Sequence, residues 1–207
     1  MKKQLIIFTI ALFCVSVLVF FISSCNKEDV ATNKGAAPVK PSSRDIDGHE
    51  LRMGLIALSP SEQRLAFEEF SSEEKVAVWL DKLDGVLALS GWTSAQIDLI
   101  EDLRDQVNEE LWSDNSTVHQ NFVNNFHDDW KNDALHEFTF DELGWIVATL
   151  DDYASGPYTP PSSEECDCSV KSDWCPVWSE CFLTSCITTA HGCGTIWVYK
   201  CTGECDY

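Results

Sequence analysis

The stretch from Cys166 to Tyr207 reads CDCSVKSDWCPVWSECFLTSCITTAHGCGTIWVYKCTGECDY and contains eight of the ten cysteines of the chain. A unit this small buries too little apolar surface to offset the entropy that its chain loses on folding. Dense, even-numbered cysteines are typical of exported domains that are held by disulfide bonds. We therefore expect four disulfides within 166–207, with the pairing left open, among Cys166, Cys168, Cys175, Cys181, Cys186, Cys193, Cys201 and Cys205.

Zinc binding is the alternative use of these cysteines. The stretch begins with one Cys-x-Cys pair but has no Cys-x-x-Cys pair, which most zinc fingers contain. Disulfides are therefore favoured, and no metal or other cofactor is expected.

Inside the cysteine-rich stretch, Thr195 to Tyr199 is rich in strand-forming residues, and Ile187 to Thr189 is a candidate partner strand. The residues His191 to Gly194 between them are typical of a turn, so we expect a short β-hairpin. Four aromatic residues are many for so small a unit. They either fill its core or form an exposed patch that contacts a membrane or a partner, and both alternatives stay open for Trp174, Trp178, Trp197 and Tyr199.

The segment Ala154 to Glu165 precedes this module and is rich in Ser and Pro, with the pairs Gly156-Pro157 and Pro160-Pro161. Glycine and proline end the preceding helical pattern, and paired prolines favour an extended backbone. We therefore expect a linker and a protease-sensitive boundary at 154–165.

Residues 45–153 show the features of a small all-α helical bundle. Capping boxes are visible where a hydroxyl residue is followed three positions later by Glu or Gln, beginning at Ser59, Ser71, Thr93 and Thr139. Apolar residues recur behind these caps with helical spacing. Stripes of this kind are Val76, Trp79, Leu80, Leu83 and Leu87; Ile97, Ile100, Leu103, Val107 and Leu111; Val118, Phe122, Phe126 and Trp130; and Leu143, Ile146, Val147 and Leu150. The expected core of the bundle includes Trp79, Trp92, Trp112, Trp130 and Trp145.

The chain is strongly acidic, with 34 acidic against 14 basic residues and a formal net charge of −20. This charge excludes binding to nucleic acid, because phosphate backbones repel it. Most of the acidic residues fall within the helical region. They either keep a monomeric bundle soluble or mask a basic or membrane-seeking segment.

The N-terminus has the order of an export signal, with Lys2 and Lys3 before an uncharged run from Leu5 to Ile22. The sequence Ile22-Ser23-Ser24-Cys25 resembles the lipobox of bacterial lipoproteins, and the charged residues after it resemble the surface-export tract of Bacteroidetes lipoproteins. The resemblance implies a signal peptide over 1–24, a lipid on Cys25, a flexible tether over 25–44 and a location on the outer membrane or cell surface. An uncleaved membrane helix is the alternative, and either would place the remaining chain outside the cytoplasm.

No motif of an enzyme is present, and we expect the chain not to be one. His119, His127 and His136 lie near acidic residues, but no His-Glu-x-x-His motif, nucleophile elbow or phosphate-binding loop occurs.

The motifs Cys166-Asp167-Cys168, Asp173-Trp174-Cys175-Pro176 and Gly192-Cys193-Gly194-Thr195, with Trp197-Val198-Tyr199, resemble the fulvocin C-type bacteriocins. These are small, disulfide-rich antibacterial peptides with eight cysteines. The helical region is similar to the long N-terminal regions of Bacteroidetes proteins classed as fulvocin C-related. The tail departs from many membrane-active peptides in being acidic rather than cationic.

Two functions follow from the resemblance and the segment order. In the first, the chain is a lipid-anchored precursor, and cleavage within 154–165 releases a peptide that acts on the envelope of competing bacteria. In the second, the chain is an unprocessed surface lipoprotein that displays the module 166–207 for binding or adhesion.

Overall fold

A computed structural model describes residues 46–152, 166–175 and 179–206. The predicted signal, tether and lipidation site (1–44), the predicted linker (154–165) and Trp178 lie outside these described residues. All of these described residues belong to one compact unit, Ser43–Tyr207.

Four helices begin where the capping boxes predict. They are α3 (Pro60–Glu68), α4 (Ser72–Leu87), α5 (Ser94–Asp105) and α8 (Phe140–Ala148). At α4, the hydroxyl of Ser71 accepts the amide of Glu74 at 3.2 Å, while the Glu74 carboxylate accepts the amide of Ser71 at 2.8 Å. Each box thus satisfies amides that have no partner within the helix.

A further helix, α2 (Gly48–Ile56), precedes the first predicted one. The carboxylate of Asp47 caps it by accepting the amides of His49 and Glu50 at 3.0 and 3.1 Å. At Gly48 the helix lies against the backbone of Ala77 in α4, where an added Cβ would be 2.2 Å from the carbonyl oxygen.

The stripe that starts at Val118 forms two α-helical pieces separated by a π-turn. These are α6 (Thr117–Asn121), the π-turn η2 (Phe122–Phe126) and α7 (His127–Glu137). An α-helix has 3.6 residues per turn, so apolar residues spaced by four drift by about 40° per turn. The wider π-turn offsets this drift, and both Phe122 and Trp130 are buried.

The stripe that starts at Ile97 does not continue as one helix. Helix α5 ends at Asp105, and the 3₁₀ turn η1 (Glu109–Trp112) follows, although Val107 and Leu111 are buried as core residues. The predicted tryptophan core is largely confirmed. Trp79, Trp112, Trp130 and Trp145 are buried, and Trp92 is half-buried against the same core.

The module has the expected disulfides and a two-stranded antiparallel sheet, so the predicted fold class is confirmed. The strands are not where the sequence placed them. Strand β1 (Cys181–Leu183) pairs with β2 (Gly203–Cys205), with Cys181 opposite Cys205. The prediction of a strand at Thr195–Tyr199 is wrong, because Thr195–Trp197 forms the 3₁₀ turn η4 within a short loop closed by a disulfide.

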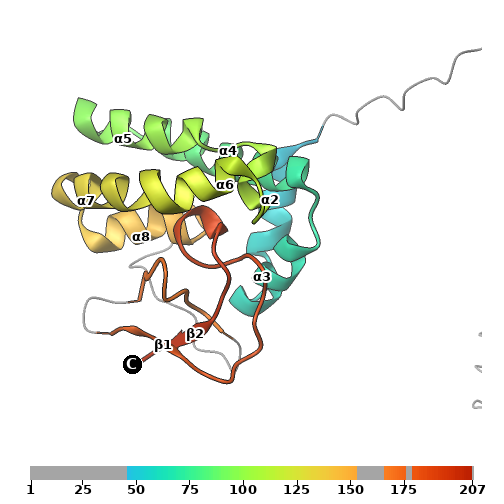
Figure 1. Cartoon of the computed structure of the whole chain (residues 1–207). Helices are drawn as coiled ribbons and strands as arrows, with labels where there is room; N and C mark the ends of the chain where they lie inside the picture. Colours follow the sequence, from blue (N-terminus) through green and yellow to red (C-terminus); the bar gives the residue numbers. More distant parts are fainter. Residues whose placement is uncertain (1–45, 153–165, 176–178, 207) are drawn as a thin grey trace, which may run out of the picture. The chain divides into compact units, whose positions relative to one another are not determined.

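Figure 1 shows this module, in orange and red, beside α3, α6 and α8. Its aromatic loop belongs to the same hydrophobic core as the helices. The module residues in that core are Trp174, Ile196, Trp197, Val198 and Tyr199. None of the helices in the described part of the chain has the length and apolar character needed to cross a bilayer.

Candidate functional site

Four disulfides cross-link the module, as predicted. They join Cys166 to Cys186, Cys168 to Cys181, Cys175 to Cys205, and Cys193 to Cys201. All four lie within the module, so none of them ties it covalently to the helices. The bridges from β1 and β2 connect the small sheet to the first residues of the module.

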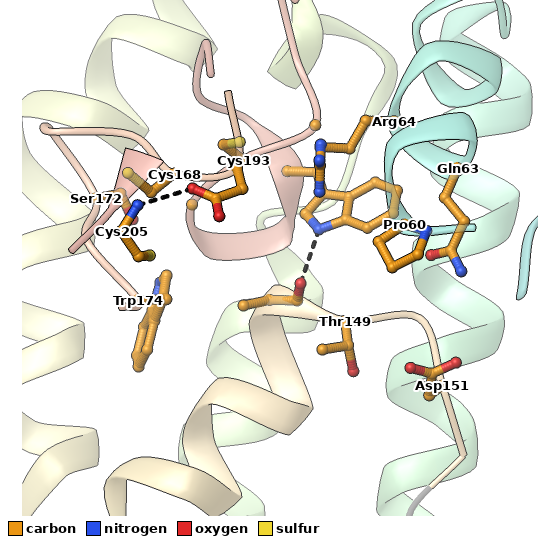
Figure 2. Close-up of a pocket in the computed structure, with 15 residues that line it drawn as sticks. Pro60, Gln63, Arg64, Thr149, Asp151, Cys168, Ser172, Trp174, Cys193 and Cys205 are labelled. Carbon is orange, nitrogen blue, oxygen red and sulfur yellow. Dashed lines mark hydrogen bonds between the residues drawn. The ribbon is translucent and has the colours of Figure 1, made fainter. Parts of the chain in front are cut away.

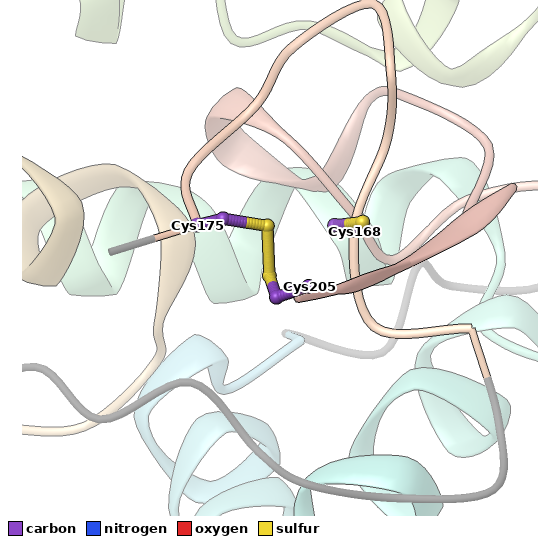
Figure 3. Close-up of side chains that lie close together, drawn as sticks. All are labelled: Cys168, Cys175 and Cys205. Atoms are coloured by element: carbon purple, nitrogen blue, oxygen red, sulfur yellow. A yellow bond between two sulfur atoms is a disulfide. The ribbon is translucent and has the colours of Figure 1, made fainter. Parts of the chain in front are cut away.

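Three sulfur atoms, those of Cys168, Cys175 and Cys205, lie within 4.8 Å of one another (Figure 3). The cluster has the composition of a thiolate metal site. Each sulfur is nevertheless part of a disulfide in this structure, and only a free thiolate binds a metal ion. The cluster therefore consists of two neighbouring disulfides, Cys168–Cys181 and Cys175–Cys205.

The loop between Cys193 and Cys201 has an unusual backbone. Gly194 has a φ of 72°, and a Cβ at that position would be 2.6 Å from the ring of Tyr199. Ile196 and Trp197 also have positive φ angles, 44° and 54°. This conformation is unfavourable for a β-branched residue, so the surrounding contacts must hold it in place. We call residues 194–199 the docking loop.

Trp197 is the central contact of the docking loop. Its ring makes edge-to-face contacts with Phe67 of α3 and Trp79 of α4, at centroid distances of 5.2 and 5.9 Å. Its indole N–H donates to the carbonyl of Ala148 at 2.9 Å, at the end of α8 (Figure 2). One side chain of the module thus contacts three helices.

A buried polar cluster lies beside these aromatic contacts. His127 of α7 has its Nε2 2.9 Å from the hydroxyl of Thr195 and 3.1 Å from that of Ser172. The indole N–H of Trp174 donates to Thr195 Oγ1 at 3.0 Å, and the amide of Thr195 donates to Ser172 Oγ at 3.0 Å. The cluster satisfies polar groups that burial would otherwise leave without partners.

The protonation state of His127 fits this role. Its Nδ1 lies 2.8 Å from a carboxylate oxygen of Asp128, which can only accept, so Nδ1 carries the proton and Nε2 accepts from a hydroxyl. Burial lowers the pKa of His127, against the effect of Asp128 and with a further decrease from Lys131. The imidazole is therefore neutral at pH 7.

Ser172, His127 and Asp128 also have the hydrogen-bond order of a hydrolase triad. Ser172 is buried, however, and its hydroxyl already contacts His127 and both the amide and hydroxyl of Thr195. Such a group is arranged to join the module to α7 rather than to meet a substrate. The sequence also drew attention to His119 and His136. The ring of His119 contacts the carbonyl of Leu111, and the ring of His136 contacts the carbonyl of Asn132. The structure therefore does not bring His119, His127 and His136 together in one site.

Lys131 of α7 makes a third contact with the module. Its Nζ donates to the carbonyl of Asp173 at 2.7 Å and lies 4.2 Å from the ring centroid of Trp174. The ring of Trp174 also packs against that of Phe140 in α8, with 5.6 Å between the ring centroids.

A small cavity of about 80 Å³ lies where α3, the end of α8 and the module meet. Figure 2 shows Arg64 and Gln63 on one side and Trp174 and Ser172 on the other. Its lining includes Thr149 and Asp151, just before the predicted linker, and Cys168, just after it. This volume is smaller than typical ligand pockets, so the cavity is a packing gap at the junction.

The aromatic residues proposed for membrane or partner contact are thus covered in the intact chain. Trp174, Trp197 and Tyr199 are 3%, 5% and 4% exposed, because they pack on the helices. An exposed patch formed by these three residues does not exist while the helices cover them. The exposed apolar residues of the described module are instead Val170, Phe182, Leu183 and Ile187.

The sequence did not indicate that His127, Ser172 and Thr195 would meet. They come from distant segments and carry no shared motif, so spacing offered no signal for the cluster.

Comparison with known proteins gives one informative match. The chain is 50% identical over 41 residues to a protein named bacteriocin fulvocin-C from Myxococcus fulvus, and this region covers 19% of the chain and 91% of that protein. This chain belongs to the fulvocin-C family. No family model matches the chain, and no solved structure matches it.

The matched length corresponds to the fulvocin-C-like module rather than to the whole chain. Because 91% of fulvocin-C is matched by only 19% of this chain, most of the helical region has no counterpart in that protein. The helices that cover the module are therefore an addition to a fulvocin-C-sized unit.

Proposed function

We propose that this chain is the precursor of a disulfide-stapled antibacterial peptide formed by residues 166–207. The observation that carries the proposal is the match across nearly the full length of a protein named as a bacteriocin. Four disulfides within the module are consistent with a product that acts outside the cytoplasm.

In this proposal, the export signal directs the chain across the membrane, and Cys25 carries a lipid that anchors it at the outer membrane or cell surface. Cleavage within 154–165 then separates the module from the helices. The released module acts on the envelope of competing bacteria by binding, without catalysis, and the intact chain is a monomer.

The helical region acts as a pro-segment in this scheme. It covers the aromatic side chains of Trp174, Trp197 and Tyr199, which in a free module would be more accessible to a target membrane. The acidic surface of the helices would keep the covered form soluble.

The test uses a synthetic peptide of residues 166–207, oxidised to the four-disulfide form and applied to a broad panel of related strains. We expect growth inhibition or membrane leakage, and no effect from the same peptide after reduction and alkylation. Absence of inhibition and leakage across the panel would contradict the proposal.

The second candidate function is a surface lipoprotein that is never processed. The exposed side chains of Phe182, Leu183 and Ile187 favour it, since they offer an apolar contact surface in the intact chain. Immunoblots of cells and medium separate the two functions. Intact chain on cells with no released fragment supports the adhesion module, and a released module supports the precursor.

A further inference from the structure

We infer that the helical region binds the module non-covalently after the linker is cut, so that separation of the two parts, and not cleavage alone, releases the active peptide. The inference deepens the proposed function and rests on it, because release of an active peptide requires that the chain is a precursor. The physical claim of retention stands on the contacts alone.

No disulfide of the described residues links the module to the helices. Every disulfide of the described chain joins two residues of the module. Once the backbone is cut between 153 and 165, only non-covalent contacts hold Cys166–Asp206 to the helices.

The non-covalent contacts are centred on buried aromatic side chains. Trp197 is inserted among Phe67, Trp79 and the end of α8, and Trp174 contacts both Lys131 and Phe140. The ring of Tyr199 packs edge-on against His127 at 5.2 Å. Buried tryptophan and tyrosine anchors of this kind dominate the affinity of stable protein interfaces.

Further contacts join the module to α3 away from the aromatic anchors. The amide of Ala190 donates to the carboxylate of Glu68 in α3 at 3.0 Å, and the stem of Arg64 packs against Gly192. Together with the His127 cluster, these contacts place polar partners around an apolar centre, which is the anatomy of a specific interface.

The backbone of the docking loop also favours retention. The positive φ angles of Ile196 and Trp197 are held by the Cys193–Cys201 disulfide on one side and by the helices on the other. The loop is therefore shaped to fit the helices before the linker is cut, so little ordering is needed to keep it bound. Cutting removes only the high effective concentration that the linker supplies.

The experiment places a recognition sequence for a site-specific protease within 154–165 of the full chain. The purified, oxidised protein is cut and analysed by gel filtration at micromolar concentration without reductant. We expect the helical fragment and the module to elute together, as the uncut chain does. Elution as two separate species would overturn the inference.

Two variants test whether the docking loop is responsible. In the cut protein, Trp197→Ala should raise the dissociation constant at least about thirtyfold and separate the fragments. Thr195→Val, which keeps the side-chain shape, should weaken retention by a smaller factor and serves if the first variant fails to fold. The matched control is Leu183→Ala, whose side chain is 74% exposed on the module, and it should leave co-elution unchanged.

The two proposals fail in different ways. If the fragments separate on cutting and the freed module inhibits growth, retention is wrong and the precursor function stands. If the fragments co-elute and the oxidised module has no effect on any strain, retention stands and the antibacterial function is wrong.

Discussion

At the scale of single residues, Lys82 shows how burial couples stability to pH. It is 2% exposed, donates to the carbonyl of Asp151, and lies 3.7 Å from the ring centroid of Trp145. Burial, with a contribution from Arg52, lowers its pKa from 10.5 to about 7. The folded chain thus releases a proton from Lys82 at a pH where the unfolded chain still binds it.

We therefore predict that the free energy of unfolding rises with pH between 7 and 9, and that Lys82→Met reduces this rise. In that window the unfolded state binds more protons, so the stabilisation grows with pH and is lost as pH falls to 7. Lys82 should contribute about 2 kcal/mol over the two units. Urea unfolding at pH 7, 8 and 9 measures the free energy of unfolding of both proteins. If it rises with pH as steeply in Lys82→Met as in the unsubstituted chain, Lys82 is not the cause of the rise.

Thr195 illustrates a residue whose contacts could not be predicted from the sequence. Its hydroxyl accepts the indole N–H of Trp174 and contacts His127 at 2.9 Å, all within a fully buried cluster. Thr195 lies in a motif that carries the family resemblance, but nothing in that motif indicates that its side chain is buried whereas that of Thr188 is exposed.

We predict that Thr195→Val destabilises the oxidised chain by about 1–3 kcal/mol, because it leaves buried donors without a partner. Thr188→Val is the matched control and should change stability by less than about 0.5 kcal/mol. Urea unfolding without reductant compares them. Equal stability of the two variants would show that the cluster does not join the module to α7.

At the scale of elements, the helix starts could be predicted because capping is local. A box such as Ser71 with Glu74 is readable within four residues and determines where α4 begins. The strand predicted at Thr195–Tyr199 failed because local propensity was overridden. Gly194 and the Cys193–Cys201 bridge close this segment into a tight loop, and the helices bury its apolar side chains.

The cap of α4 gives a prediction with a control one residue away. Ser71→Ala removes the hydroxyl that accepts the amide of Glu74 and should cost about 1 kcal/mol. Ser72→Ala changes the first helical residue, which is exposed and makes no cap, and should have little effect. Thermal and urea unfolding measure both, and equal losses would contradict the capping assignment.

At the scale of the whole molecule, the sequence left open whether the module's aromatic residues fill a small core of their own or form an exposed patch. In the described residues they instead pack into the hydrophobic core of the helices. Periodicity identifies which face of each helix is apolar but not which distant segment covers it. Contacts such as Trp197 with Phe67, or Lys131 with Asp173, join residues far apart in the chain. The aromatic residues that looked excessive for a small module are explained by this shared core.

The shared core also has a functional consequence within the proposal. In the proposed precursor, the helices cover the aromatic side chains of the module through the same contacts that stabilise the fold. The contacts that stabilise the helices are then the same contacts that cover Trp174, Trp197 and Tyr199.

Amide hydrogen exchange tests this coupling most directly. The amides of Cys193, Trp197 and Tyr199 are hydrogen-bonded within or next to the docking loop, and Ser71→Ala destabilises α4 without touching that loop. If helices and module open together, the variant should lower the exchange protection of these three amides by the same amount, about 1 kcal/mol, as that of the α4 core amides. Protection of the docking-loop amides that stays unchanged while α4 loses protection would contradict a shared core.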